Sequence, residues 1–218
     1  MTKSDDLFEA IRRNDAKRVA ELLDEDRTLL RAKSGNTSGL LFVVYHGHPE
    51  MVQLFTSRGA QLSFHEACAL GDRARVHELL KEEPSLLASY SEDGYPACGL
   101  SIFFKHPELA RELIEWGADV NAAARNPQRV APVHAAAAVC DHDTMRLLLE
   151  RGADPNTRQQ GGFTAFHSAA SRGDIEMARL LLAHGADPHA RTDDGKTAAE
   201  IAEQYKQPAF AEWFRANV

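Results

Sequence analysis

The chain has 218 residues, of which 44% are hydrophobic and 26% are charged, and its formal net charge is −7. This composition is that of a folded soluble protein, and a protein that grips phosphate backbones needs an excess of Lys and Arg, so we expect no nucleic-acid partner. No apolar run reaches about 18 residues, and the opening sequence MTKSDDLFEA lacks the apolar core of a secretory signal, so we expect no membrane association.

A pattern of two short helices separated by a tight turn recurs along the chain. The turn falls at Asn14, Gly47, Gly71, Lys105, Cys140 and Gly173, at steps of 33, 24, 34, 35 and 33 residues. The predicted repeats span about 5–33, 34–62, 63–92, 93–127, 128–160 and 161–192, and a capping segment follows at 193–218. We therefore predict a single domain over residues 1–218.

Each predicted unit has an apolar pair near the end of its second helix. These pairs are Leu22-Leu23, Leu79-Leu80, Leu113-Ile114, Leu148-Leu149 and Leu181-Leu182. The second unit departs from the pattern, since Phe55 is followed there by Thr56. No single unit can bury its own apolar face, so stability must come from the stacking of neighbouring units.

Two stretches carry a specific resemblance. APVHAAA at 131–137 and TAFHSAA at 164–170 lie 33 residues apart, and each is followed by a leucine run and a Gly-Ala-Asp turn. The chain resembles the ankyrin-repeat family, whose signature is T-P-L-H-x-A at this period, and in particular its compact bacterial members. The resemblance covers essentially the whole chain and implies an all-α solenoid of stacked helix-turn-helix units joined by short hairpin loops.

Two departures from the regular spacing predict local changes in this architecture. The step of 24 residues between Gly47 and Gly71 leaves almost no room for a hairpin, so we expect a missing or stunted hairpin and a notch there. The stretch NAAARNPQRVAP at 121–132 is two residues longer than standard, so we expect that hairpin to protrude.

The candidates for chemistry are weak. His167, Ser168 and Asp174 are residue types of hydrolases, but Ser168 lacks the G-x-S-x-G elbow that would expose a nucleophile. His65, His134 and His167 occupy one repeat position, where the family resemblance implies a histidine that ties a hairpin to its neighbour. We therefore predict no enzyme, no catalytic or metal-binding residues and no cofactor.

Cysteine usage indicates the redox environment. Cys68, Cys98 and Cys140 are odd in number and form no C-x-x-C pair, which favours a reducing compartment over a disulfide framework. We expect a cytoplasmic protein in which all three are small apolar core residues.

Partner binding is expected on the concave side, which the hairpin tips and the ends of the first helices line. An apolar row on that side is unusual for a solvent-facing surface and favours a protein or peptide ligand. Its members are Tyr45, Leu70, Tyr95, Phe103, Phe104, Val139 and Phe163, and an arginine rim accompanies it at Arg125, Arg129, Arg158, Arg172 and Arg191.

Alternatives to this binding surface remain open. The apolar row could turn inward at the notch and pack there. It could instead bury against a second copy of the chain, although we expect a monomer. A plain solvated surface is the alternative for the arginine rim.

Overall fold

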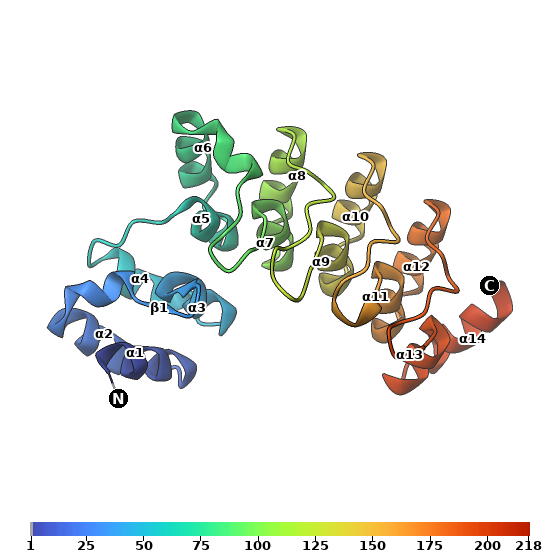
Figure 1. Ribbon diagram of the computed structural model, residues 1–218, viewed down its shortest axis with the longest axis horizontal. Coiled ribbons are helices and arrows are strands. Elements are labelled where there is room, and N and C mark those ends of the chain that lie inside the picture. The colour runs from blue at the N-terminus through green and yellow to red at the C-terminus, as the bar shows by residue number, and fades with distance from the viewer. Residues whose placement is uncertain (1) are drawn as a thin grey trace.

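The computed structural model describes residues 2–218, and Met1, with which the predicted domain begins, lies outside them. The described chain is an all-α solenoid in which pairs of helices follow one another along an arch, with the two termini at its ends (Figure 1). The pairs are α1 (Lys3–Arg12) with α2 (Ala16–Glu25), α3 (Gly39–Tyr45) with α4 (Val52–Thr56), α5 (Phe64–Leu70) with α6 (Arg73–Glu82), α7 (Ala97–Phe103) with α8 (Pro107–Glu115), α9 (Pro132–Val139) with α10 (His142–Glu150), α11 (Ala165–Arg172) with α12 (Ile175–Ala183), and α13 (Ala198–Gln204) with α14 (Pro208–Asn217).

Two devices start the second helix of a pair. In four pairs an aspartate follows the turn residue, and its carboxylate accepts the backbone N–H three residues on, which satisfies one of the free donors of the first turn. These residues are Asp15, Asp72, Asp141 and Asp174. In α8 and α14 a proline opens the helix instead, at a position that lacks an intrahelical partner for an N–H.

The main core runs from α5 to α14. First helices pack against first helices in sequence, α5 on α7, α7 on α9, α9 on α11 and α11 on α13. Small residues at this face, such as Ala136 and Ala169, are fully buried and permit the close approach. The second helices bury Leu148 and Leu181 behind them. In Figure 1 the first helices form the inner row of the arch and the second helices the outer row.

The N-terminal part has a core of its own. Leu7, Leu22 and Phe55 belong to a buried cluster built from α1 to α4, separate from the cluster that starts at Phe64. A loop over residues 57–63 joins α4 to α5 without a hairpin, as the short spacing predicts, and the N-terminal helices sit apart from the regular row (Figure 1). A smaller apolar cluster, containing Leu41, Val44, Ala69 and Leu100, bridges the two cores.

The connections after α2 and α6 also differ from the later Gly-Ala-Asp turns. Each continues into a 3₁₀-helix, η1 (Arg27–Arg31) and η3 (Pro84–Ala88). After η1 comes the only two-stranded sheet within residues 2–218, in which β1 (Lys33–Ser34) pairs antiparallel with β2 (Thr37–Ser38). Two other short 3₁₀ segments are η2 (Pro49–Met51) and η4 (Gln160–Gly162).

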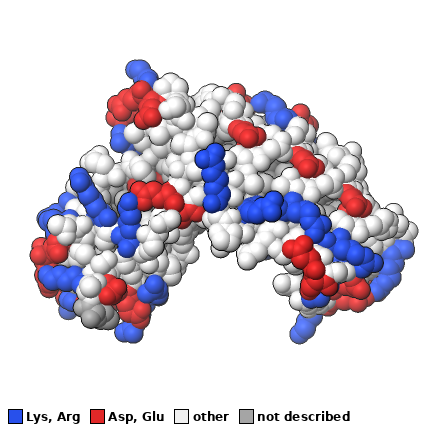
Figure 2. Space-filling view, in the orientation of Figure 1, with Lys and Arg blue, Asp and Glu red and all other residues white. Residues whose placement is uncertain are grey.

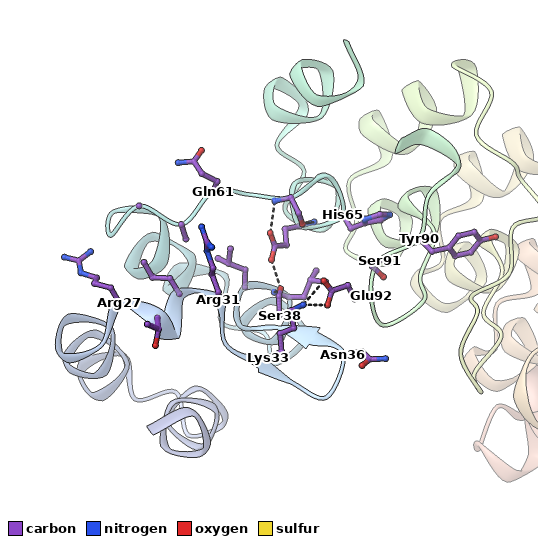
Figure 3. A pocket seen from close by; sticks show the side chains of 18 residues that line it. Arg27, Arg31, Lys33, Asn36, Ser38, Gln61, His65, Tyr90, Ser91 and Glu92 are labelled. Carbon is purple, nitrogen blue, oxygen red and sulfur yellow. Dashed lines mark hydrogen bonds and ion pairs between the residues drawn. The ribbon is translucent and has the colours of Figure 1, made fainter. Parts of the chain in front are cut away.

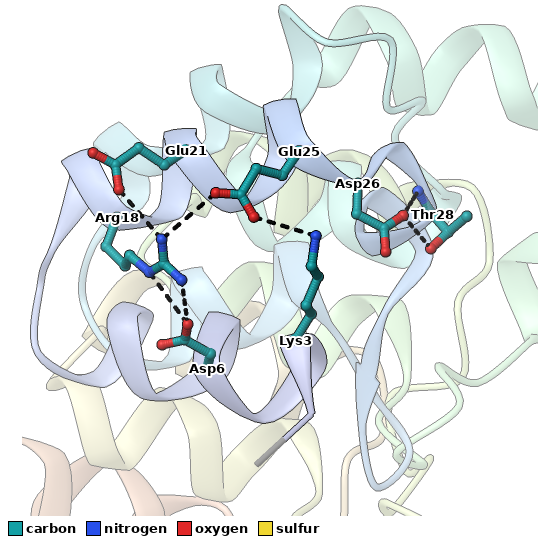
Figure 4. A network of polar contacts seen from close by, with 7 residues as sticks. All are labelled: Lys3, Asp6, Arg18, Glu21, Glu25, Asp26 and Thr28. Atoms are coloured by element: carbon teal, nitrogen blue, oxygen red, sulfur yellow. Dashed lines mark hydrogen bonds and ion pairs between the residues drawn. The ribbon is translucent and has the colours of Figure 1, made fainter.

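A network of ion pairs holds α1 against α2 (Figure 4). Arg18 contacts Asp6 at 2.6 Å, Glu21 at 3.3 Å and Glu25 at 3.9 Å, and Lys3 reaches Glu25 at 3.2 Å. These side chains are substantially exposed, so each pair contributes little to stability. The network orients the first pair of helices, whereas the apolar cluster beneath it supplies the stability.

None of the helices in the described part of the chain is long and apolar enough to cross a membrane.

Candidate functional site

The histidines of the repeat signature act as structural ties. In His167 the Nε2–H donates to the Ala190 carbonyl at 3.1 Å, and Nδ1 accepts from the Thr164 backbone N–H at 3.2 Å. His134 repeats the arrangement, donating to the Thr157 carbonyl at 2.9 Å and accepting from the Ala131 N–H at 3.0 Å. Each ring thus joins the start of its helix to the following hairpin, which confirms the role that the family resemblance implies. Burial lowers the pKa of both rings, so they stay neutral.

Two of the three cysteines are core residues as predicted. Cys68 and Cys98 are buried, and burial raises the pKa of Cys98 to about 12. Cys140 corrects the prediction, because it is exposed and ends α9 in the left-handed conformation that the turn requires, at φ 56°. Within residues 2–218, no group of three or more His, Cys, Asp or Glu side chains is arranged to hold a metal ion.

Four members of the apolar row come together where the two cores meet, and we call Tyr45, Tyr95, Phe103 and Phe104 the aromatic cluster. The rings of Tyr45 and Phe104 stack with centroids 5.6 Å apart, and Tyr45 meets Tyr95 edge-on at 6.3 Å. Phe103 contacts Phe104 at 5.3 Å with perpendicular planes. The aromatic cluster therefore joins the second unit, the hairpin before α7 and the end of α7.

The cluster is part packed and part exposed. Tyr45 and Phe104 are half-buried, and the Tyr45 hydroxyl is buried without a hydrogen-bond partner. Burial, reinforced by the negative charge of Asp93, raises the pKa of Tyr45. Phe103 differs from its neighbours because 51% of it is exposed. Inward packing at the notch thus accounts for Tyr45 and Phe104 but leaves Phe103 facing solvent.

An apolar pocket of about 280 Å³ opens beside Phe103. It lies at the lower limit of the range that drug-sized ligands occupy, so it suits a single large side chain. Its lining combines the aromatic cluster with small and aliphatic residues from α7, α9 and the long loop before α9, namely Gly99, Leu100, Val130 and Ala135.

The other apolar residues of the predicted row lie elsewhere or are covered. Leu70 is half-buried beside the cluster. Val139 and Phe163 pack against the main core, and Phe163 approaches the His167 ring at 5.6 Å. The structure thus brings together five of the seven predicted residues, whereas Val139 and Phe163 are packed against the main core.

The arginines of the predicted rim are all exposed but are not equally free. Arg158 pairs with Asp193 at 3.0 Å, and Arg191 donates to the Gly195 carbonyl at 2.7 Å. Arg125 lies over the Tyr90 ring at 3.8 Å from its centre, a cation–π arrangement. Figure 2 shows Lys and Arg side chains in a band over the loops that precede α9 and α11. Arg129 lies in the long loop before α9, with φ 52°, and Arg172 is the last residue of α11.

A cleft of about 1110 Å³ occupies the gap where the hairpin is missing (Figure 3). One wall is η1 and β1, the roof is the loop over residues 59–63, and the far wall is the hairpin at 90–92. The starts of α3 and α5 form its floor, where Glu66 accepts hydrogen bonds from the Ser38 hydroxyl at 2.5 Å and the Ser63 N–H at 2.7 Å. The short repeat spacing predicts a notch here, but the residues that line it follow only from the structure.

A further exposed aromatic residue was missed by sequence reasoning. Trp116 is 44% exposed on the outer row, and its ring meets His77 edge-on at 4.8 Å. A signal was available, because the residue before the Gly-Ala turn is Arg58, Arg151 or His184 in the other units and only here a tryptophan.

Comparison with known protein families gives two matches. Residues 64–159 match a family model described as ankyrin repeats (3 copies), and residues 148–202 match one described as ankyrin repeats (many copies). A search of curated proteins found no match.

Proposed function

Because the chain belongs to the ankyrin-repeat family, whose repeats are generally protein–protein interaction modules, we propose that it binds a protein or peptide on its concave face and performs no chemistry of its own. The exposure of Phe103 beside the 280 Å³ apolar pocket carries this proposal. An exposed aromatic ring next to an unfilled apolar pocket is the arrangement that binding hot spots share.

The surroundings of Phe103 support a peptide ligand. α7 belongs to the inner row of the arch, and Arg129 directly precedes Val130 in the pocket wall. Apolar contact at the centre with charge at the rim is typical of protein interfaces. The odd number of cysteines and the lack of a C-x-x-C pair accord with a cytoplasmic location, which we include in the proposal.

A paired pull-down from a lysate of the source organism tests the proposal. One bait is the native protein and the other carries Phe103→Asp, which leaves the half-buried Phe104 in place and so spares the packing at the notch. The matched control is Tyr205→Asp, because Tyr205 is also 51% exposed but lies on the last unit. Circular dichroism of all three baits checks that they fold.

A partner that is lost from the Phe103→Asp bait and kept on the Tyr205→Asp bait supports binding at the aromatic cluster. Identical recovery on all baits contradicts it. Sedimentation velocity across concentration tests the alternative of self-association: a dimer that Phe103→Asp dissociates would assign the surface to a second copy of the chain.

A further inference from the structure

The row of hairpins is interrupted at one place. In the regular part, consecutive hairpins are joined by backbone hydrogen bonds of 2.8–2.9 Å, which run from Arg125 N–H to the Gly94 carbonyl, from Gln160 N–H to Gln128 and from Asp193 N–H to Gly161. Across the gap, the hydrogen bonds and ion pairs between the two flanking hairpins in the described chain come from side chains alone. Lys33 pairs with Glu92 at 2.6 Å, and the Thr37 hydroxyl donates to Asp93 at 3.3 Å.

The cleft above these contacts has the dimensions for a segment of extended chain. Its volume is about 1110 Å³, and it lies between two hairpins whose backbones are not joined to each other. An extended peptide commonly binds by adding to such an exposed strand edge. The cleft therefore lies where the hairpin that is missing between α4 and α5 would be.

The charged side chains that line the cleft indicate which kind of peptide segment could bind there. Arg27, Arg31 and Lys33 form the N-terminal wall, and Lys33 is neutralised by Glu92. Arg31 points from η1 toward the loop over residues 59–63 (Figure 3), and it makes no ion pair or side-chain hydrogen bond with residues 2–218. Arg27 is paired with Asp24 at 4.0 Å, and the hydrogen bonds to Glu66 occupy its two oxygens without removing its charge. Arg31 is therefore the cationic side chain of the lining that has no carboxylate partner among residues 2–218, and it is the group that a carboxylate of a ligand would meet.

This charge argues against a second copy of the chain as the occupant. The hairpin tips that could insert carry arginines at positions 125, 129, 158 and 191, which would meet Arg31. Three acidic residues of these tips are already paired within the chain, Glu92 with Lys33, Asp193 with Arg158 and Asp194 with Lys196. Juxtaposed like charges disfavour an interface. A segment rich in Asp or Glu is complementary instead.

We propose that the cleft binds an extended acidic segment of a partner protein, lying where the missing hairpin would lie and placing a carboxylate on Arg31. The inference rests on the proposed function for the existence of a protein partner, but it uses a surface distinct from the aromatic cluster.

Peptide selection tests this directly. Random peptides displayed on phage are selected on the immobilised full-length protein, and the affinity of the enriched peptides is measured by fluorescence anisotropy. Three variants are compared with the native protein. They are Arg31→Glu, a hairpin graft in which residues 61–62 are replaced by a copy of residues 154–163, and Arg111→Glu, a control that makes the same charge change on an exposed arginine of α8.

The expected result is a set of acidic peptides whose binding weakens about tenfold or more with Arg31→Glu, is abolished by the graft and changes less than about twofold with Arg111→Glu. Binding should also weaken as salt is raised. Selection of no acidic peptide, or of peptides that bind Arg31→Glu as tightly as the native protein, overturns the inference. If the hairpin graft does not fold, the comparison of peptide affinity between Arg31→Glu and Arg111→Glu decides the test without it. Phe103→Asp is measured in the same assay and should leave the peptide affinities unchanged, because the aromatic cluster is a different surface. A negative pull-down would therefore contradict binding at the aromatic cluster without contradicting the site for acidic peptides.

Discussion

At the scale of single residues, one carboxylate ties the two parts of the solenoid together. Glu66 is only 6% exposed and completes the capping box of α5 through the Ser63 N–H. Its other oxygen accepts from Ser38, the N-cap of α3 in the preceding unit. A buried acceptor that serves two helix starts is costly to remove, because both donors then lose their partner.

We predict that Glu66→Ala lowers the free energy of unfolding by about 2–3 kcal/mol. The matched control is Glu200→Ala, since Glu200 holds the same capping-box position in α13 but is exposed and serves only its own helix. That change should cost clearly less than Glu66→Ala, because solvent can replace the partner of each donor. Urea unfolding followed by circular dichroism measures both, and equal costs would show that the link from Glu66 to Ser38 contributes nothing.

The buried histidines predict a pH dependence of stability. His134 and His167 have lowered pKa values in the folded state, so the unfolded chain binds their protons first as the pH falls below about 6.5. Stability is therefore fully present above that pH and decreases below it, by at most about 1.4 kcal/mol per pH unit for each histidine. Unfolding free energies at pH 7.5 and 5.5 test this, and His134→Gln should reduce the difference. A pH-independent stability over this range would contradict it.

At the scale of elements, neighbouring helix pairs contact each other at the turns that join their two helices. The turn residue after α5 is Gly71, at φ 71°, and the His106 ring of the next unit lies directly over it. His106 Nε2–H donates to the Ala69 carbonyl at 3.0 Å, which fastens one turn to the next. Glycine is required here for its left-handed conformation and also for the space that a side chain would take from the ring.

This packing predicts different costs for one substitution at two turns. Gly47 has a similar φ of 75°, but a Cβ added there would have no neighbour within 4 Å, whereas at Gly71 it would collide with His106. Gly47→Ala should cost about 1–2 kcal/mol from backbone strain alone, and Gly71→Ala should cost more, since it also displaces His106. Thermal or urea unfolding of the two variants compares them, and equal losses would mean that His106 moves aside freely.

At the scale of the whole molecule, two cores are joined by limited contacts. Residues 7–55 and 64–214 form separate buried clusters, and the contacts that bridge them include a small apolar cluster, the aromatic cluster, Glu66 and the side-chain contacts of Lys33 with Glu92 and of Thr37 with Asp93. In a solenoid, stability is a sum of unit and interface terms, so a weak interface lets one part open without the other.

We therefore predict that amide hydrogens of α1 to α4 exchange faster than those of α9 to α12. Phe55→Ala removes a fully buried ring from the smaller core at a cost of about 3–5 kcal/mol, and it should accelerate exchange in α1 to α4 while leaving α9 to α12 unchanged. Phe166→Ala is the matched change in the larger core. Hydrogen exchange read by mass spectrometry makes the comparison, and uniform acceleration by Phe55→Ala would show a single cooperative unit.

The sequence by itself determined the repeating helix pairs and the missing hairpin. It could do so because these features depend on local spacing: the turn residues recur at a fixed period, and a step of 24 residues cannot contain a hairpin. The role of the signature histidines came from the family resemblance, which their repeat position supports. The prediction for Cys140 failed because small size was taken to mean burial, whereas the position is an exposed turn.

Only the tertiary structure decided which side chains face a ligand. Phe103 and Phe104 are adjacent in the sequence, yet one is exposed and the other stacks on Tyr45 from two units earlier. Arg31 is unpaired among residues 2–218 while nearby Lys33 is held by Glu92, 59 residues along the chain. Exposure and pairing of this kind depend on residues that meet only when units stack, and the displaced N-terminal core changes which ones meet.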